Sequence, residues 1–179
     1  RKLTDGNVLT RSFGYDQYGR LTSKTNAAGT EVARFVYNAN GWVSSRWTPV
    51  HTNTVYSYDA GGNLTGVDYV ASPDLSFQYD ALNRMTTNVI AGTFTNVYTW
   101  TGLGQLASAD GPWPSDTVSY TYNNAALRSA LSLSQPSGTW TNGLSYDATK
   151  RMTNMTSAAG TFGYTYDATS KLRVQKVVW

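Results

Sequence analysis

The sequence predicts an all-β protein in which tandem β-hairpins form a long, curved or spiral antiparallel sheet. Three observations support this fold class. An aromatic-led phrase recurs at intervals of 20 to 24 residues, large apolar residues alternate with small or polar ones before each lead aromatic, and turn-forming residues follow it. A period near 21 residues is typical of a quasi-one-dimensional array in which each unit contacts mainly its neighbours.

The repeated phrase is clearest near the N-terminus, where it reads Tyr15-Asp16-Gln17-Tyr18-Gly19-Arg20-Leu21. Eight copies can be aligned by their first aromatic residue, and the last four match more weakly. These lead aromatics are Tyr15, Tyr37, Tyr58, Tyr79, Trp100, Tyr122, Tyr146 and Tyr166.

The residues before each lead aromatic predict a β-strand with one buried face. Residues 75–79 read Leu-Ser-Phe-Gln-Tyr, and residues 118–122 alternate in the same way. Period-two alternation with aromatic and β-branched residues is the strand signature. An apolar residue six positions after the aromatic predicts the start of a return strand on the same face: Leu21, Val43, Leu64, Met85, Leu106, Met152 and Leu172.

The residues after each lead aromatic predict a tight turn. Asp or Asn suits the first position of a type I turn, and Gly in the fourth position can adopt the left-handed conformation that gives a G1-type bulge. Asn is the usual substitute for that Gly. The predicted turn residues are Asp16, Gly19, Asn38, Gly41, Asp59, Gly62, Asp80, Asn83, Gly104, Asp147 and Asp167.

The pattern also predicts where the array is irregular. Leu127 comes one residue early, so we expect a register adjustment or a bulge around Ala125 to Ala130. Residues 26–29 and 157–160 read Asn-Ala-Ala-Gly and Ser-Ala-Ala-Gly, which predicts the same turn chemistry at the far end of the hairpins. All five prolines fall between predicted strands, as expected of residues that cannot donate to a ladder.

Composition and charge narrow the classes of function. The net charge is +3, charged residues make up 14% of the chain and the basic residues are scattered, which favours an ordinary solvated surface over nucleic-acid binding. Cys is absent and His51 is the single histidine, so we expect no metal, no cofactor and no enzymatic activity. The periodic aspartates are explained as turn formers, without a cation-binding row.

The phrase resembles the YD repeats of the RHS family, whose consensus is Tyr-Asp-x-x-Gly-Arg-Leu followed by a Thr-rich strand. Residues 15–22 match it at every fixed position. The resemblance implies a spiral sheet that forms part of a shell, as in bacterial polymorphic toxins, the C components of insecticidal toxin complexes, and teneurins. The Asp-Pro-Gly cleavage signature of the family is not visible, so its self-cleavage aspartates are assigned to no residue here.

The resemblance implies a structural role. We expect residues 1–179 to be a single array of about eight units within a longer polypeptide, forming part of an encapsulating shell or surface scaffold that is secreted or at the cell surface of a bacterium. The implied partners are the rest of the polypeptide, an encapsulated toxin domain and, through open sheet edges, further copies of the chain.

Two alternatives from other classes remain at this point. Regularly spaced aromatics could stack on sugars in a carbohydrate- or wall-binding module, although rings that pack on one another across adjacent strands as the sheet's own core explain the same spacing. Exposed sheet edges could instead make the chain a subunit of a self-assembling extracellular fibre.

Overall fold

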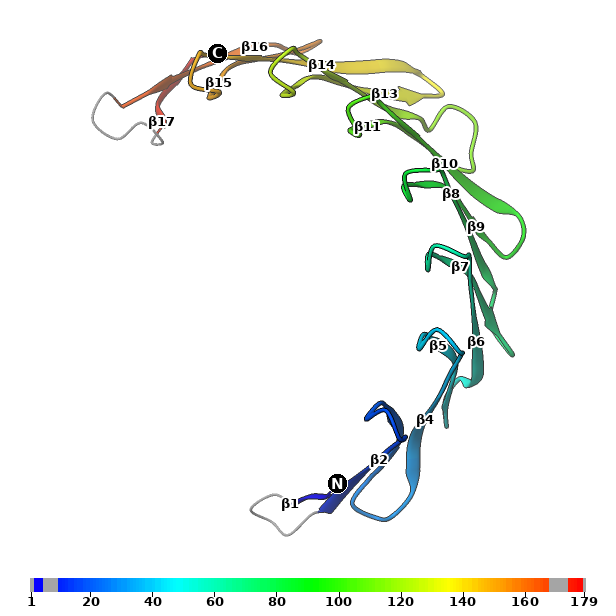
Figure 1. The fold of residues 1–179 in the computed structure, drawn as a ribbon. Coiled ribbons are helices and arrows are strands. Elements are labelled where there is room, and N and C mark those ends of the chain that lie inside the picture. Colours follow the sequence, from blue (N-terminus) through cyan, green and yellow to red (C-terminus); the bar gives the residue numbers. More distant parts are fainter. Residues whose placement is uncertain (1, 5–9, 168–173, 179) are drawn as a thin grey trace. The chain divides into compact units, whose positions relative to one another are not determined.

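The computed structural model describes residues 2–4, 10–167 and 174–178, and all regular secondary structure in these ranges is β (Figure 1). The predicted all-β fold of tandem hairpins is confirmed. The internal contacts divide the chain into two compact units, Arg1–Phe94 and Thr95–Trp179. Within the described ranges, no helix is long and apolar enough to cross a membrane.

The first unit is an antiparallel sheet in which each strand pairs with the next along the chain. Its strands are β1 (Lys2–Thr4), β2 (Thr10–Tyr15), β3 (Leu21–Thr25), β4 (Glu31–Tyr37), β5 (Val43–Thr48), β6 (Thr52–Tyr58), β7 (Leu64–Tyr69), β8 (Leu75–Tyr79) and β9 (Met85–Ile90).

The second unit has the same antiparallel order. Its strands are β10 (Phe94–Trp100), β11 (Leu106–Asp110), β12 (Val118–Tyr122), β13 (Arg128–Gln135), β14 (Gly138–Tyr146), β15 (Met152–Ser157), β16 (Gly160–Tyr166) and β17 (Val174–Val178). All five prolines lie between strands, as predicted.

Each lead aromatic is the last residue of its strand, and a one-residue bulge follows on the return strand. In the first hairpin Gly14 pairs with Ser23 but Tyr15 pairs with Leu21, so Thr22 is the extra residue. The lead aromatic pairs with the residue six positions later in this hairpin and in those led by Tyr37, Tyr58, Tyr79, Trp100, Tyr122 and Tyr146.

The hairpin led by Tyr122 also keeps this register, and the bulge predicted around Ala125 to Ala130 is confirmed, with Ser129 as the extra residue. Tyr122 pairs with Arg128 and Thr121 with Ala130, which is the bulge found in the other hairpins. Leu127 therefore occupies the position that Arg20 has in the first hairpin. The backbone of the turn sets the register, and the exchange of an apolar and a basic residue does not shift it.

Two predictions about turns are corrected. Tyr166 pairs with Val174, eight positions later, so the offset of six fails in this hairpin, and Leu172 lies outside the described residues. Gly29 has φ 79° and completes a turn like those after the lead aromatics, whereas Ser157 pairs directly with Gly160, whose φ is 136°. The second connection is thus a two-residue hairpin without a bulge.

The two faces of each sheet differ in chemistry because side chains alternate along a strand. We call the face that carries the lead aromatics the lead face; on β4 it bears Tyr37, Phe35 and Ala33, while the opposite face bears Val36, half exposed at 50%. The buried side chains of the described residues are few: Ala33 (8% exposed), Val67 (5%) and Thr54 (5%). Each unit is a single layer, so its order depends on cross-strand contacts more than on a core.

Candidate functional site: the junction between successive repeats

The turn after each lead aromatic is built around one side-chain acceptor. Asp80 Oδ1 accepts hydrogen bonds from the backbone N–H groups of Leu82 (2.9 Å) and Arg84 (3.0 Å), and Asp80 Oδ2 accepts one from Arg84 Nε (2.7 Å). The backbone N–H of Asn83 donates to the carbonyl of Asp80 at 3.0 Å. This is a type I turn stabilised by its first side chain.

The other predicted turn residues occupy equivalent places. Asp16, Asn38, Asp59 and Asp147 accept from the backbone in the same way, and Asn123 joins them. The fourth position is left-handed at Gly19 (79°), Gly41 (84°), Gly62 (89°), Asn83 (59°) and Gly104 (81°). Asp167 directly follows β16, and the residues after it lie outside the described part of the chain.

The turn carboxylates are held in the ionised state. The side chain of Arg84 donates to Asp80, the side chain of Asn63 donates to Asp59, and the backbone N–H of Arg151 donates to Asp147. Each bond lowers the pKa of the carboxyl below its usual value, because it favours the charged form. At neutral pH these groups act as fixed acceptors in the turns.

A hydroxyl bond links six of the eight repeats to the one before it. Tyr37 Oη donates to the carbonyl of Leu21 at 2.8 Å, and Tyr58 Oη donates to the carbonyl of Val43 at 2.9 Å. The acceptor is in each case the first residue of the preceding return strand. The same bond is made by Tyr79 to Leu64 (2.9 Å), Tyr122 to Leu106 (2.8 Å), Tyr146 to Arg128 (2.8 Å) and Tyr166 to Met152 (2.7 Å).

This bond is the feature that the sequence interpretation missed. The phrase suggests only that the rings pack, which Phe would do as well as Tyr. The available signal was that seven of the eight lead residues are Tyr, none is Phe and one is Trp. A preference for a ring with a hydroxyl at a half-buried position indicates a hydrogen-bond partner.

A second contact comes from the residue five positions after the lead aromatic, which we call the bridging position. The guanidinium carbon of Arg20 lies 4.4 Å from the ring centroid of Tyr37, and Trp42 packs on Tyr58 with centroids 5.2 Å apart. Arg151 lies over Tyr166 at 4.6 Å. Residues of different chemistry thus cover the next lead ring from the same position.

Two polar bridging residues bond to the fourth turn position of the next repeat. Asn63 Nδ2 donates to Asn83 Oδ1 at 2.8 Å, and Gln105 Nε2 donates to the carbonyl of Ala126 at 2.9 Å. At Gly62 the approach is closest, because a Cβ added there would lie 2.7 Å from a ring carbon of Trp42. Gly62 is therefore required by its left-handed φ and by the space its neighbour occupies.

The geometry of the junction favours packing over sugar binding by the lead aromatics. The hydroxyls of six lead tyrosines are used within the sheet, and bridging residues cover the rings of Tyr37, Tyr58 and Tyr166. His51 lies exposed in the loop between β5 and β6, and its backbone N–H donates to Thr48 Oγ1 at 3.2 Å. Among the described residues, no group of three or more His, Cys, Asp or Glu side chains is placed to hold a metal ion.

Comparison with known proteins now identifies the family. Residues 1–91 match the family model described as Teneurin YD-shell, which covers just over half of the 179 residues. The chain belongs to the YD-shell family. The predicted resemblance to RHS/YD-repeat proteins is confirmed, and membership supports a shell or scaffold role.

Solved structures with the same fold come from toxin complexes. A crystal structure of TcdB2-TccC3 is 17% identical with a TM-score of 0.67, over 90% of this chain and 10% of that chain. A structure of the Photorhabdus luminescens Tc holotoxin pore is 16% identical with a TM-score of 0.70, over 97% of this chain and 10% of that chain. This chain therefore spans about a tenth of the length of the chains it matches. No curated protein matches it.

Proposed function

We propose that this chain is a section of the wall of a YD-repeat shell that encloses a toxic cargo domain and confines it until delivery. Its role in the shell is structural and non-catalytic. The complete protein is secreted or held at the surface of a bacterium, and the partners of this section are the remaining repeats and the enclosed domain.

The observation that carries the proposal is the hydroxyl bond between successive repeats. It recurs with donor–acceptor distances of 2.7 to 2.9 Å at three junctions of the first unit and three of the second. A contact between successive repeats that recurs along the chain can be extended to further repeats. That is the property a wall needs if it is to grow long enough to enclose another domain.

A sheet of this kind would confine its cargo by exclusion. Hydrogen bonds between neighbouring strands satisfy the backbone groups inside the wall. The wall therefore has few unpaired strand edges with which an extended segment of the cargo could pair. The cargo behind the wall is shielded from proteases. That the enclosed partner is a toxic domain is supported by the similar fold of a chain in the Tc holotoxin pore.

Limited proteolysis of the complete polypeptide tests this proposal. We expect the region that follows the repeats to resist digestion within the intact protein and to be digested rapidly when it is expressed alone. The catalytic activity of that region, if it is toxic, should be released only when the shell is opened. Equal digestion rates for the attached and the isolated region would contradict encapsulation.

Tyrosine variants connect that result to the junction described above. Tyr58→Phe removes the bond to Val43, and Tyr56→Phe removes a hydroxyl of the same strand that has no hydrogen-bond partner among the described residues. We expect faster digestion of the enclosed region in Tyr58→Phe than in Tyr56→Phe. Identical rates would show that the junction bond does not maintain the wall.

A further inference from the structure

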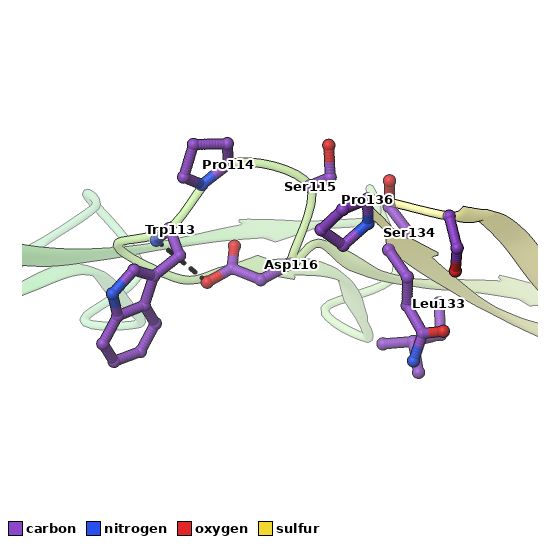
Figure 2. Close-up of a pocket in the computed structure, with 9 residues that line it drawn as sticks. Trp113, Pro114, Ser115, Asp116, Leu133, Ser134 and Pro136 are labelled. Atoms are coloured by element: carbon purple, nitrogen blue, oxygen red, sulfur yellow. Dashed lines mark hydrogen bonds between the residues drawn. The ribbon is translucent and has the colours of Figure 1, made fainter.

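An open pocket of about 440 Å³ lies between two loops of the second unit (Figure 2). One loop connects β11 to β12 and the other connects β13 to β14. In an antiparallel meander these connections lie at the end of the strands opposite to the lead turns, so the pocket is separate from the repeat junctions. Its lining consists of Trp113, Pro114, Ser115, Asp116, Leu133, Ser134, Gln135, Pro136 and Ser137.

The loop that carries Trp113 is held in shape by Asp116. The backbone N–H groups of Gly111 and Trp113 donate to Asp116 Oδ1 and Oδ2, each at 3.0 Å. A Cβ at position 111 would lie 2.2 Å from Asp116 Oδ2, so only glycine permits this approach. The backbone N–H of Ser134 donates to the carbonyl of Thr117 at 2.8 Å and ties the loop to β13. The pocket is therefore formed before any ligand arrives.

The apolar part of the pocket consists of the rings of Trp113, Pro114 and Pro136 and the side chain of Leu133. The indole of Trp113 is 65% exposed, and Figure 2 shows it on one side of the pocket with Leu133 and Pro136 on the other. The Pro114 ring lies on the loop above it. Large exposed aromatic side chains beside a concave surface are a common mark of a binding site.

The polar part of the pocket carries little available charge. Ser115, Ser134, Gln135 and Ser137 are neutral donors and acceptors, and no Lys or Arg belongs to the lining. Asp116 is the single charged lining residue, and both of its oxygens already accept backbone N–H groups. An anionic ligand would meet a carboxylate without a compensating cation, and a purely apolar ligand would leave hydroxyl and amide groups without partners.

The backbone around the pocket does not favour an extended peptide. A peptide usually gains affinity by adding a strand to an open sheet edge. Here β12 pairs with β11 and β13, and β13 pairs with β12 and β14, so both flanking strands already have two neighbours.

We propose that this pocket binds a neutral saccharide. The C–H face of a pyranose ring stacks on the Trp113 indole, and its hydroxyls exchange hydrogen bonds with the serine hydroxyls and the Gln135 amide. This inference does not depend on the proposed shell function and uses none of the lead aromatics.

Titration calorimetry with the complete chain tests the proposal. The probes are a cello-oligosaccharide, a chito-oligosaccharide and, as the anionic control, an oligogalacturonate. We expect saturable binding of at least one neutral probe and weaker binding of the oligogalacturonate. No saturable binding of either neutral probe, or preferred binding of the anionic one, would overturn the proposal.

Two tryptophan variants locate the site. Trp113→Ala should weaken binding roughly tenfold through loss of the stacked ring. Trp140→Ala is the matched control, because Trp140 pairs with Leu133 across the strands and is 43% exposed but does not line the pocket. It should bind as the unmodified chain does. Equal loss in both variants, with unchanged far-ultraviolet dichroism, would overturn the assignment.

A conservative variant covers the case in which Trp113→Ala fails to fold. Trp113→Phe keeps a smaller ring and should give an intermediate affinity. Unchanged affinity would contradict the proposed contact with the larger indole face. A titration with an unstructured casein peptide distinguishes saccharide binding from polypeptide binding at this pocket. Binding of the peptide through Trp113, in the absence of saccharide binding, would assign the pocket to polypeptide and refute the proposal.

Discussion

The two units build the same hairpin with different residues in its most demanding position. In Arg1–Phe94 the fourth turn position is held by Gly19, Gly41, Gly62 and Asn83, all residues that accept a left-handed backbone. In Thr95–Trp179 it is held by Gly104 and then by Ala126 (φ 61°) and Lys150 (φ 67°). A residue with a Cβ costs about 1–2 kcal/mol in this conformation.

The difference shows that the turn sequence is not what keeps the repeats in phase. The bulge and the tyrosine hydroxyl bond to the preceding repeat are the same in both units, at Tyr58 in the first and at Tyr146 in the second. Contacts between neighbouring repeats therefore compensate for an unfavourable turn residue. Substitutions can separate the two contributions.

The largest expected effect is at the close contact between Trp42 and Gly62 in the first unit. Gly62→Ala combines a left-handed Cβ with a clash against Trp42, and we expect a loss of about 3 kcal/mol in the free energy of unfolding. Gly19→Ala has a similar φ of 79° but no neighbouring atom within 4 Å of the added Cβ. It should lose only about 1 kcal/mol. Urea denaturation followed by dichroism measures both, and equal losses would show that the Trp42 contact is unimportant.

A smaller effect is expected at the hydroxyl bonds, and it should be the same in both units. Tyr58→Phe and Tyr122→Phe each leave a half-buried carbonyl without its donor, which should cost about 1 kcal/mol. Tyr56→Phe is the control and should change stability little. A loss confined to one unit would contradict the view that the junctions are equivalent.

The turns of the second unit that carry a strained residue in the fourth position should be stabilised by substitution with glycine. Ala126→Gly and Lys150→Gly remove a strained Cβ, and we expect each to stabilise the chain by about 0.5–1 kcal/mol despite the greater flexibility of glycine when unfolded. Thermal unfolding measures the gain. Destabilisation by either variant would mean that its side chain makes a contact worth more than the strain.

The smallest effect is the acid response of the turns. Hydrogen bonds from the Arg84 side chain and backbone lower the pKa of Asp80. The stability that the folded state gains from this carboxylate is therefore complete above the unfolded pKa of about 4, and it is lost as pH falls through the lower folded pKa. Asp80→Asn keeps the amide oxygen that Asn38 uses in its turn. It should be less stable than the parent chain near neutral pH, with the difference narrowing on acidification.

Thermal unfolding midpoints at about pH 6 and about pH 3 measure this change. In the first unit the pKa is lowered for Asp16, Asp59 and Asp80, and in the described part of the second unit it is lowered for Asp147. A gap between Asp80→Asn and parent that stays constant with pH would show that the carboxylate charge contributes nothing.

The local sequence pattern predicts some of the turns and strand starts but not others. Gly41 and Asn83 indicate a left-handed turn position in the sequence, because few other residues adopt this backbone conformation without an energetic cost. Ala126 and Lys150 give no such signal, and the early Leu127 adds no shift beyond the bulge at Ser129, which the other hairpins also have. The pairing of Tyr166 with Val174 was missed because the loop length, and not the apolar pattern, decides where a return strand begins.

The sequence by itself determined the period, the all-β hairpins, the strand ends and the exclusion of proline from the strands, because these follow from side-chain alternation and from backbone preferences within one repeat. The tertiary structure decided which atoms join the repeats: the Tyr37 hydroxyl on the carbonyl of Leu21, the ring of Trp42 over Gly62, and the pocket beside Trp113. These contacts link residues about 16 to 24 positions apart in the chain. Local propensity carries no information on them, since they exist only once neighbouring hairpins are paired.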